Sequence, residues 1–426
     1  MRALAILYLF VAASYATAIP LGKGPDETAH VRYIEFLAQE HRLPVFDPQH
    51  PDPDYEFHQP PLYYALSLPA YILSRGGETG QQAVRFLTLL LSLPLIYLTF
   101  ALGRRLAPDE QWIGVAAAGV VAFLPMQLSV ATTIGNDSLV EVFSAGVLLL
   151  LVSYITTAAR HRSGKSEAPP SASPMVAVGA LIGLAMLTKS VAVLLFPVAW
   201  LGALFAARNH DGIRWRQCFL HAAVATGIAL LISGWWLIRN QLLYGDPLAQ
   251  RAFLRAFEGL RPSPQSFMQQ FHVASVGDYI RQVALWTLAS ATGVFGPVHG
   301  NRFAFFPYYI YFATGIPALV AAVGFARYLG RTKLADWQRQ SWWLCGAFAL
   351  MLLASFVRFN FSFFQAQARY LFPALPAAAV AFILGLSALF PVRLRVAILV
   401  IAVALLGGLA FVGLHLWIAP QFITSL

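Results

Sequence analysis

Long apolar stretches alternate with short polar ones along nearly the whole chain. Most are long enough to cross about 30 Å of hydrocarbon as helices. Since a backbone in lipid can satisfy its own hydrogen bonds only as a helix or a closed barrel, the pattern predicts an all-α polytopic membrane protein. About eleven transmembrane helices are predicted, at residues 3–20, 82–103, 111–132, 138–158, 175–188, 190–207, 218–238, 307–326, 341–357, 370–390 and 396–418.

Two of these spans share one apolar run that is too long for a single helix, residues 175–208. The polar residues Thr188, Lys189 and Ser190 interrupt it. A single tilted helix would leave the Lys189 ammonium group unpaired in mid-membrane. We therefore interpret the run as a helical hairpin with Lys189 at its outer tip.

Basic residues fall between the apolar runs, in clusters that the positive-inside rule assigns to cytoplasmic loops. They are Arg104 and Arg105, and residues 160–165, 208–216, 327–339 and 393–395. An odd number of spans then places the N-terminus inside and the C-terminus outside. Two long outer segments result, residues 21–81 and 239–306, within a single transmembrane domain of residues 1–426. We expect amphipathic juxtamembrane helices in these segments and the function of the protein beside them.

Composition agrees with this picture, because 58% of residues are hydrophobic and only 11% are charged. The net charge of +10 lies in the loop clusters, so it indicates membrane orientation and no nucleic-acid partner. The first apolar run also has features of a secretory signal, namely Arg2 and the small residues 16–18. We interpret it as a retained first span.

Two constellations at the predicted outer face carry candidate chemistry. Asp26 and Glu27 directly follow the first span, with His30 one helical turn beyond Asp26. A carboxylate there suits a general base, and it equally suits the N-cap of a surface helix. His58 and Gln59 precede a double proline and two tyrosines, a pattern that fits either a substrate-binding turn or an aromatic interfacial anchor.

These motifs together resemble the GT-C superfamily of glycosyltransferases, in particular protein O-mannosyltransferases and lipid A aminoarabinose transferases. The resemblance spans the whole chain and is closest to a poorly characterised bacterial branch of the superfamily. Its elements are the acidic pair, Pro60 to Tyr64, Asn136 to Leu139, Gly183 to Lys189, Arg239 and Asn240, Tyr244 to Pro247, and Gln367 to Pro373. One departure is the His58-Gln59-Pro60 sequence, where these relatives commonly carry a lysine or a simple His-Pro-Pro.

The resemblance implies an inverting transferase of the bacterial inner membrane that moves a sugar from a polyprenyl-phosphate carrier to an extracytoplasmic glycan, lipid or protein acceptor. Asp26 matches the catalytic acidic residue of the family, and Glu27 the second position of its pair. The implied substrate-binding residues are His58, Gln59, Tyr63, Asp137, Lys189, Arg239, Arg369 and Tyr370. Lys189, Arg239 and Arg369 are expected to converge on the lipid phosphate.

Two other functions fit parts of the same pattern. A transporter or flippase for lipid-linked saccharides would need similar basic residues, but it should also show internal repeats and ionisable residues serving both faces. A ligase with a pyrophosphate donor differs only in its donor. Snorkelling to lipid headgroups would also explain each cation. The metal requirement stays open, and Mg²⁺ or Mn²⁺ is a candidate because some GT-C enzymes use a divalent cation.

Overall fold

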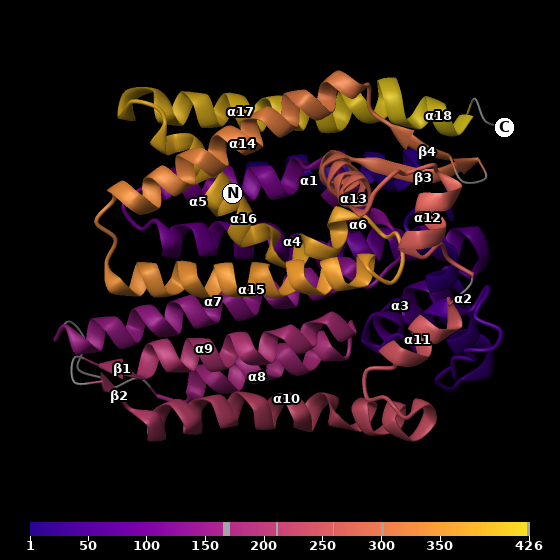
Figure 1. Cartoon of the computed structure of the whole chain (residues 1–426), viewed down its shortest axis with the longest axis horizontal. Coiled ribbons are helices and arrows are strands. Elements are labelled where there is room, and N and C mark those ends of the chain that lie inside the picture. The colour runs from indigo at the N-terminus through magenta and orange to yellow at the C-terminus, as the bar shows by residue number, and fades with distance from the viewer. Residues whose placement is uncertain (165–170, 210–211, 259, 300–301, 424–426) are drawn as a thin grey trace.

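The computed structural model of the chain describes residues 1–164, 171–209, 212–258, 260–299 and 302–423. Its longer helices run side by side along one axis and form the body of the protein (Figure 1). They are α1 (Arg2–Ala18), α4 (Gly77–Leu106), α5 (Gln111–Phe123), α7 (Asp137–Arg162), α8 (Ser173–Met186), α9 (Leu195–Ala207), α10 (Trp215–Tyr244), α14 (Tyr308–Arg331), α15 (Asp336–Asn360), α16 (Leu375–Ala388) and α17 (Val392–Gly413). The short helix α6 (Pro125–Thr132) follows α5 at an angle.

Shorter elements gather at one end of the body, on the right in Figure 1, which we call the loop end. They are α2 (Glu27–Glu40), the 3-10 turn η1 (Tyr55–His58), α3 (Leu62–Leu73), α11 (Gln250–Ala256), α12 (Pro264–Gln270), α13 (Val276–Thr292), the antiparallel strands β3 (Val294–His299) and β4 (Arg302–Phe305), the π-helical turn η4 (Leu414–Ile418) and α18 (Ala419–Ile423). The small hairpin of β1 (Arg208–Asn209) and β2 (Gly212–Ile213) lies at the opposite end.

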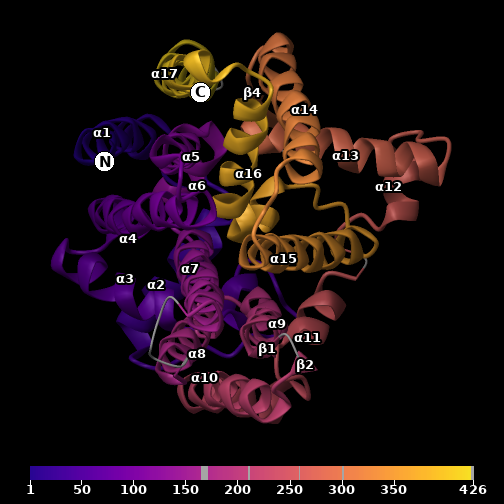
Figure 2. The same cartoon turned by 90° about the vertical axis from the view of Figure 1, so that its left-hand side faces the viewer.

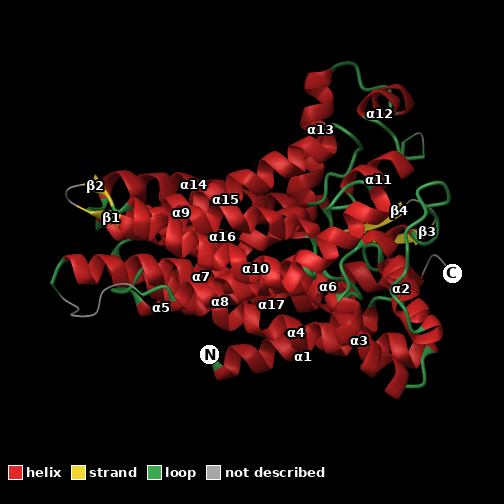
Figure 3. Ribbon diagram, turned by 90° about the horizontal axis from the view of Figure 1, so that it is seen from below, coloured by secondary structure: helices red, strands yellow, loops and turns green. Residues whose placement is uncertain are grey.

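The two predicted outer segments both lie at the loop end. Residues 21–81 contribute α2, η1 and α3, and residues 239–306 contribute α11 to β4. Residues 259, 300 and 301 of the second segment lie outside the described residues. Figure 3 shows the N-terminus toward the end that carries β1 and β2, and Figure 1 shows α18 at the loop end. This arrangement requires the chain to pass along the body an odd number of times.

Within the described residues, eight helical segments are long and apolar enough to cross a membrane, and the bent pair α5 and α6 would be a ninth. Two more predicted spans correspond to the shorter apolar helices α1 and α8, of 17 and 14 residues. The all-α polytopic class is therefore confirmed. The count of eleven spans stays a prediction.

The predicted span of residues 111–132 is not one straight helix. It bends by 64° between α5 and α6, at Leu124 and Pro125. The proline ring disfavours the helical conformation of the residue before it, and Leu124 is extended with φ −65° and ψ 117°. The bend lets α6 cross the end of the body instead of continuing along it.

The predicted hairpin at Lys189 is confirmed. Helix α8 ends at Met186, Lys189 is extended, and the 3-10 turn η2 (Ser190–Leu194) leads into α9. Helix α7 lies in the middle of the bundle between α4, α8, α9 and α15 (Figure 2). Its first residue, Asp137, therefore opens the most central helix at the loop end, beside the tip of the hairpin.

Candidate functional site

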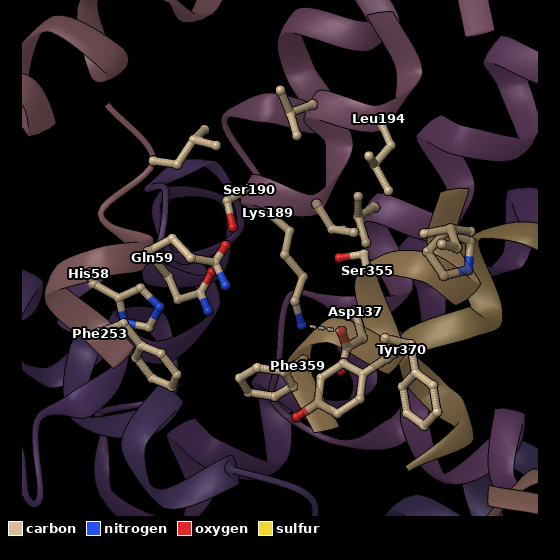
Figure 4. A pocket seen from close by; sticks show the side chains of 18 of the residues that line it. His58, Gln59, Asp137, Lys189, Ser190, Leu194, Phe253, Ser355, Phe359 and Tyr370 are labelled. Carbon is tan, nitrogen blue, oxygen red and sulfur yellow. Dashed lines mark hydrogen bonds and ion pairs between the residues drawn. The ribbon is translucent and has the colours of Figure 1, made fainter. Parts of the chain in front are cut away.

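A cavity of about 440 Å³ lies at the loop end. Residues from α2, η1, α7, η2, α11, α15 and the 3-10 turn η3 (Ala368–Ala374) line it, so most of the loop-end elements contribute. Several of the lining residues on α15 and η2 are apolar, and Lys189 and Asp137 meet in the middle of the view in Figure 4. The charged and polar lining residues include Asp26, His30, Glu56, His58, Gln59, Asp137, Glu141, Lys189, Ser190, Asp246, Arg251, Arg358, Arg369 and Tyr370.

An ion cluster of four residues joins four distant parts of the chain inside this cavity. Arg369 bridges two carboxylates, donating from Nη1 to Asp137 (2.8 Å) and from Nη2 to Asp26. Lys189 donates to the other oxygen of Asp137. The Arg369 side chain is almost fully buried, which is tolerable for a charge only when it is paired in this way. Two of the three cations predicted to converge, Lys189 and Arg369, therefore do so.

The position of Asp26 follows from the turn between α1 and α2. Gly24 lies so close to Thr133 that a Cβ atom at this position would come within 2.2 Å of the threonine methyl carbon. Asp26 itself has a left-handed backbone, with φ 56°, a conformation that aspartate tolerates better than most residues. Its side chain makes no capping hydrogen bond to α2. The N-cap interpretation therefore fails for the side chain, which instead accepts from Tyr55 Oη (3.0 Å) and Arg369.

Glu27 does not line the cavity, which contradicts its expected catalytic place. Its carboxylate is fully buried and forms a two-pronged ion pair with Arg85, at 2.7 Å to Nε and 2.6 Å to Nη2. It also accepts from the backbone N–H groups of Gly24 and Ile134, both at 3.1 Å. Adjacent helical residues point in different directions, so Glu27 faces the core where Asp26 faces the cavity.

Arg85 completes this buried lock on the other side. Its remaining N–H groups donate to three carbonyl oxygens at the end of α1, those of Ala16, Ile19 and Pro20, at 2.6–3.0 Å. The pair therefore ties the end of α1, α4 and the α6–α7 turn together. We call Glu27 and Arg85 the buried lock.

The electrostatics favour an ionised Asp26. Burial acts to raise the pKa of its carboxyl, but the charge and hydrogen bond of Arg369, assisted by His30 and Tyr55, hold that pKa below its usual 3.8. The side chain is 33% exposed, compared with 11% for Asp137 and 0% for Glu27. Among these three carboxylates, Asp26 is thus the one that a bound molecule can reach.

Next to Asp26 lies a second pair of titratable groups, His30 and Glu56. His30 Nδ1 is hydrogen-bonded to Tyr64 Oη at 2.8 Å and lies 3.9 Å from Glu56 Oε2. Burial lowers the pKa of His30 and raises that of Glu56, so each neutral form is favoured.

His58 and Gln59 both line the cavity, beside each other and beside Phe253 (Figure 4). His58 Nδ1 is 2.6 Å from the carbonyl oxygen of Tyr55, and burial lowers the pKa of His58 to about 4. Gln59 is bonded to Asn136. Tyr370 also lines the cavity, with its ring centroid 5.0 Å from the Arg369 guanidinium carbon and 5.9 Å from Lys189 Nζ.

Two residues expected at the substrate site lie elsewhere. Tyr63 is fully buried, where its hydroxyl pairs with Thr88 (2.6 Å) and accepts from the Gly135 N–H (3.0 Å), so it holds helices together. Arg239 is also absent from the cavity lining. Its guanidinium stacks on Trp236 at 4.7 Å and donates to the Pro44 carbonyl at 2.6 Å. The expected convergence of three cations is therefore wrong for Arg239.

Two other arginines line the cavity instead, Arg251 on α11 and Arg358 on α15. Both are exposed, and neither guanidinium forms an ion pair within the described chain. From the sequence, Arg358 looks like a headgroup contact at a helix end, and Arg251 carries no motif. No sequence signal singles them out, because only the fold brings α11 to the end of α15.

The two aspartates of the ion cluster are the candidate ligands for a divalent cation, and both are paired with arginine. The described residues contain no group of three or more His, Cys, Asp or Glu side chains placed to hold a metal ion. Asp26 and Asp137, the natural ligands for Mg²⁺ or Mn²⁺, are bridged by the Arg369 guanidinium. A positive side chain thus occupies the place between the carboxylates that a metal would need.

Comparison with known proteins gives a consistent set of relatives. The family model of dolichyl-phosphate-mannose-protein mannosyltransferases matches residues 58–237. No curated protein matches the sequence. The oligosaccharyltransferase of Archaeoglobus fulgidus, solved with a tethered acceptor peptide, superposes with a TM-score of 0.56 at 15% identity over 100% of this chain and 54% of its own.

A second similar structure is ArnT from Cupriavidus metallidurans bound to undecaprenyl phosphate. It has a TM-score of 0.53 at 17% identity, over 95% of this chain and 62% of its own. The archaeal oligosaccharyltransferase has also been solved with an inhibitory peptide and a dolichol-phosphate. The present chain spans little more than half the length of the archaeal enzyme.

The chain therefore shares the fold of the archaeal oligosaccharyltransferase and of ArnT. The comparisons thus show a shared fold over nearly the whole chain and a family similarity over residues 58–237.

Proposed function

We propose that the chain is an inverting glycosyltransferase that moves a sugar from a polyprenyl-phosphate carrier to an acceptor outside the bacterial inner membrane. The observation that carries this proposal is the meeting of Asp26 with Lys189 and Arg369 in one cavity. A reachable carboxylate and nearby cations are the two things that this transfer needs, because the phosphate is already a good leaving group.

In the proposed reaction, Asp26 accepts the proton of an acceptor hydroxyl. The acceptor oxygen attacks the anomeric carbon from the side opposite the phosphate, which inverts the configuration there. The bond between that carbon and the phosphate oxygen breaks, and its electron pair stays on the phosphate. Polyprenyl phosphate then leaves with one more negative charge than the donor phosphodiester carried.

The extra charge on the leaving phosphate explains the role that we assign to the two exposed arginines of the lining, Arg251 and Arg358, which we call the cavity mouth. Lys189 and Arg369 are already paired with Asp26 and Asp137, so their positive charge is largely compensated. Arg251 and Arg358 are uncompensated and stand where a lipid would enter beside Leu352, Phe356 and other apolar lining residues. We assign them to the carrier phosphate, with Lys189 beside them.

Transport is the less favoured function for a specific reason. The ion cluster, the buried lock and the two long outer segments all lie at one end of the body, as expected for chemistry at a single face. A carrier that alternates its access needs ionisable groups that serve both faces. The asymmetry therefore supports an enzyme, with the loop end outside and the β1–β2 end in the cytoplasm.

A donor panel tests the proposal. The purified chain, reconstituted in liposomes, would receive undecaprenyl-phosphate and undecaprenyl-diphosphate forms of several radiolabelled sugars, together with a cell-envelope extract as acceptor. Transfer from a monophosphate donor is the expected result. Transfer from diphosphate donors alone would assign the chain to the ligases and overturn the donor class.

A further inference from the structure

Two nitrogen atoms on one wall of the cavity have no hydrogen-bond partner in the described part of the chain: Nε2 of His58 and Nε2 of Gln59. Both residues line the cavity, and Figure 4 shows them adjacent, across the cavity from Asp137 and Tyr370. Their other polar atoms are engaged with protein. The hydrogen-bonding character of each free nitrogen follows from these fixed contacts.

His58 presents an acceptor. Its Nδ1 lies 2.6 Å from the Tyr55 carbonyl oxygen, which can only accept, so the proton must be on Nδ1. In the neutral imidazole, Nε2 then carries a lone pair. The ring is held between Phe46 and Phe253, with centroids at 5.6 and 4.5 Å, so it cannot turn over easily.

Gln59 presents a donor. Asn136 Nδ2 is 2.9 Å from the Thr188 carbonyl oxygen, which identifies it as the amino group. The same Nδ2 lies 3.2 Å from Gln59, so the atom of Gln59 that faces it must be the carbonyl oxygen Oε1. The NH₂ group of Gln59 is therefore the part left to the cavity. A chain of contacts that starts at Thr188 thus fixes the orientation.

We propose that His58 and Gln59 form an acceptor–donor pair that reads two neighbouring hydroxyl groups on the donor sugar. One hydroxyl donates to His58 Nε2, and the next accepts from the Gln59 NH₂. This assignment rests on the proposed function, since it needs a sugar in the cavity. The donor would then be a sugar with two adjacent free hydroxyl groups on the edge of its ring that faces His58 and Gln59.

The surroundings of the pair suit a sugar better than a phosphate. A lone pair on His58 would repel an anion, and the cations of the cavity mouth and ion cluster lie on other elements. Phe253 adds an apolar ring beside His58, against which the C–H groups of a pyranose can pack. The wall of η1 therefore separates sugar recognition from phosphate recognition.

Two substitutions remove only the cavity-facing atoms. In His58→Asn, the shorter amide keeps a donor for the Tyr55 carbonyl and loses the acceptor at the Nε2 position. In Gln59→Glu, the carboxylate still accepts from Asn136 and the donor is gone. His41→Asn is a matched control, because His41 is exposed and has the left-handed backbone that asparagine tolerates.

The measurement is the affinity of the full chain in detergent for undecaprenyl-phosphate glucose, each of its monodeoxy analogues, and undecaprenyl phosphate alone. Wild type should lose about tenfold in affinity for the analogues that lack either of two adjacent hydroxyls, as expected for a neutral hydrogen bond. In His58→Asn, the monodeoxy analogue that lacks one of these hydroxyls should bind as well as the parent donor. In Gln59→Glu, the same should hold for the analogue that lacks the neighbouring hydroxyl. His41→Asn should keep the wild-type affinities. Undecaprenyl phosphate should bind His58→Asn as it binds wild type.

Other outcomes separate the two proposals. If wild type binds neither undecaprenyl phosphate nor its glycosides, the proposed function fails. If it binds them but both variants keep the wild-type ratio for every deoxy analogue, His58 and Gln59 do not read the sugar, although the transferase remains. The same affinities would also be measured for undecaprenyl-phosphate N-acetylglucosamine. If both variants change only the contribution of its acetamido group, the pair recognises an amide and not a diol, and the proposal is overturned.

Discussion

Asp26 and Glu27 are neighbours in the chain, yet their carboxylates have opposite environments. Glu27 is buried in an ion pair with Arg85. Two backbone N–H groups donate to Glu27, and three backbone carbonyl oxygens accept from Arg85. Asp26 belongs to the ion cluster, which opens on the cavity and leaves a third of its side chain exposed. Of two adjacent acidic residues, one can therefore stabilise the fold while the other faces the cavity.

The largest expected effect separates the two carboxylates by activity. Asp26→Asn keeps the size and most hydrogen bonds but removes the basicity, so turnover should fall by about 10² or more. Glu27→Gln should leave the turnover of correctly folded protein much less affected. Turnover per mole of protein that binds undecaprenyl phosphate is the quantity to measure. Near-normal turnover of Asp26→Asn would reduce Asp26 to a structural residue.

A second substitution tests the lock by stability. Arg85→Met leaves the Glu27 carboxylate buried and unpaired, which should cost about 3–5 kcal/mol in the free energy of unfolding. Replacing both, as Glu27→Leu with Arg85→Met, should recover much of that loss, because no unpaired charge remains. Thermal unfolding in detergent would report both variants. An unchanged melting temperature in the single variant would contradict the lock.

A smaller effect is expected at the cavity mouth. Arg251→Gln and Arg358→Gln should each weaken the binding of undecaprenyl phosphate by about tenfold, within the range of a hydrogen bond to a charged group. Arg281→Gln on α13 removes the same charge from an exposed arginine outside the cavity lining and should change affinity little. Equal losses in all three would show that only the general positive charge of the loop end matters.

The pH dependence should sharpen the role of Arg369. The pKa of Asp26 lies below 3.8, so its carboxylate is ionised at neutral pH, and the base should be lost only as pH falls through that lowered pKa. Without Arg369 the effect of burial is no longer offset, so Arg369→Gln should move the acidic limb of kcat/KM to higher pH. A limb that stays in place would show that Arg369 does not tune Asp26.

Chelation should have the smallest effect. Since Arg369 bridges the two carboxylates that would hold a metal, EDTA should leave turnover unchanged. A loss that Mg²⁺ or Mn²⁺ restores would mean that a cation displaces the guanidinium during the reaction.

The fold class could be predicted from the sequence because it depends on long apolar runs. The hairpin could be predicted because Lys189 interrupts one of these runs. The sequence predicts one straight span at residues 111–132, and the bend at Pro125 differs from it. The proline that causes the bend is a local signal in the sequence. The place of Glu27 was also accessible, since neighbouring residues on a helix do not face the same way. In these cases the rule was local and needed only to be applied.

The rest of the site depends on long-range packing that no local pattern contains. Arg239 belongs to a family-like motif, but at the end of α10 it stacks on Trp236 of its own helix and donates to Pro44, outside the cavity lining. Arg251 reaches the cavity because α11 folds back toward α15. Which basic residues meet is decided by how distant helices cross.

The central claim is that Asp26 drives cleavage of a sugar from a polyprenyl monophosphate in this cavity. The most direct test is the formation of undecaprenyl phosphate from an undecaprenyl-phosphate sugar, in liposomes with a cell-envelope acceptor extract, by wild type and by Asp26→Asn. The account predicts that both bind the donor and that only wild type releases undecaprenyl phosphate at an appreciable rate. Equal release by both, or movement of the intact glycolipid across the bilayer without cleavage, would contradict it.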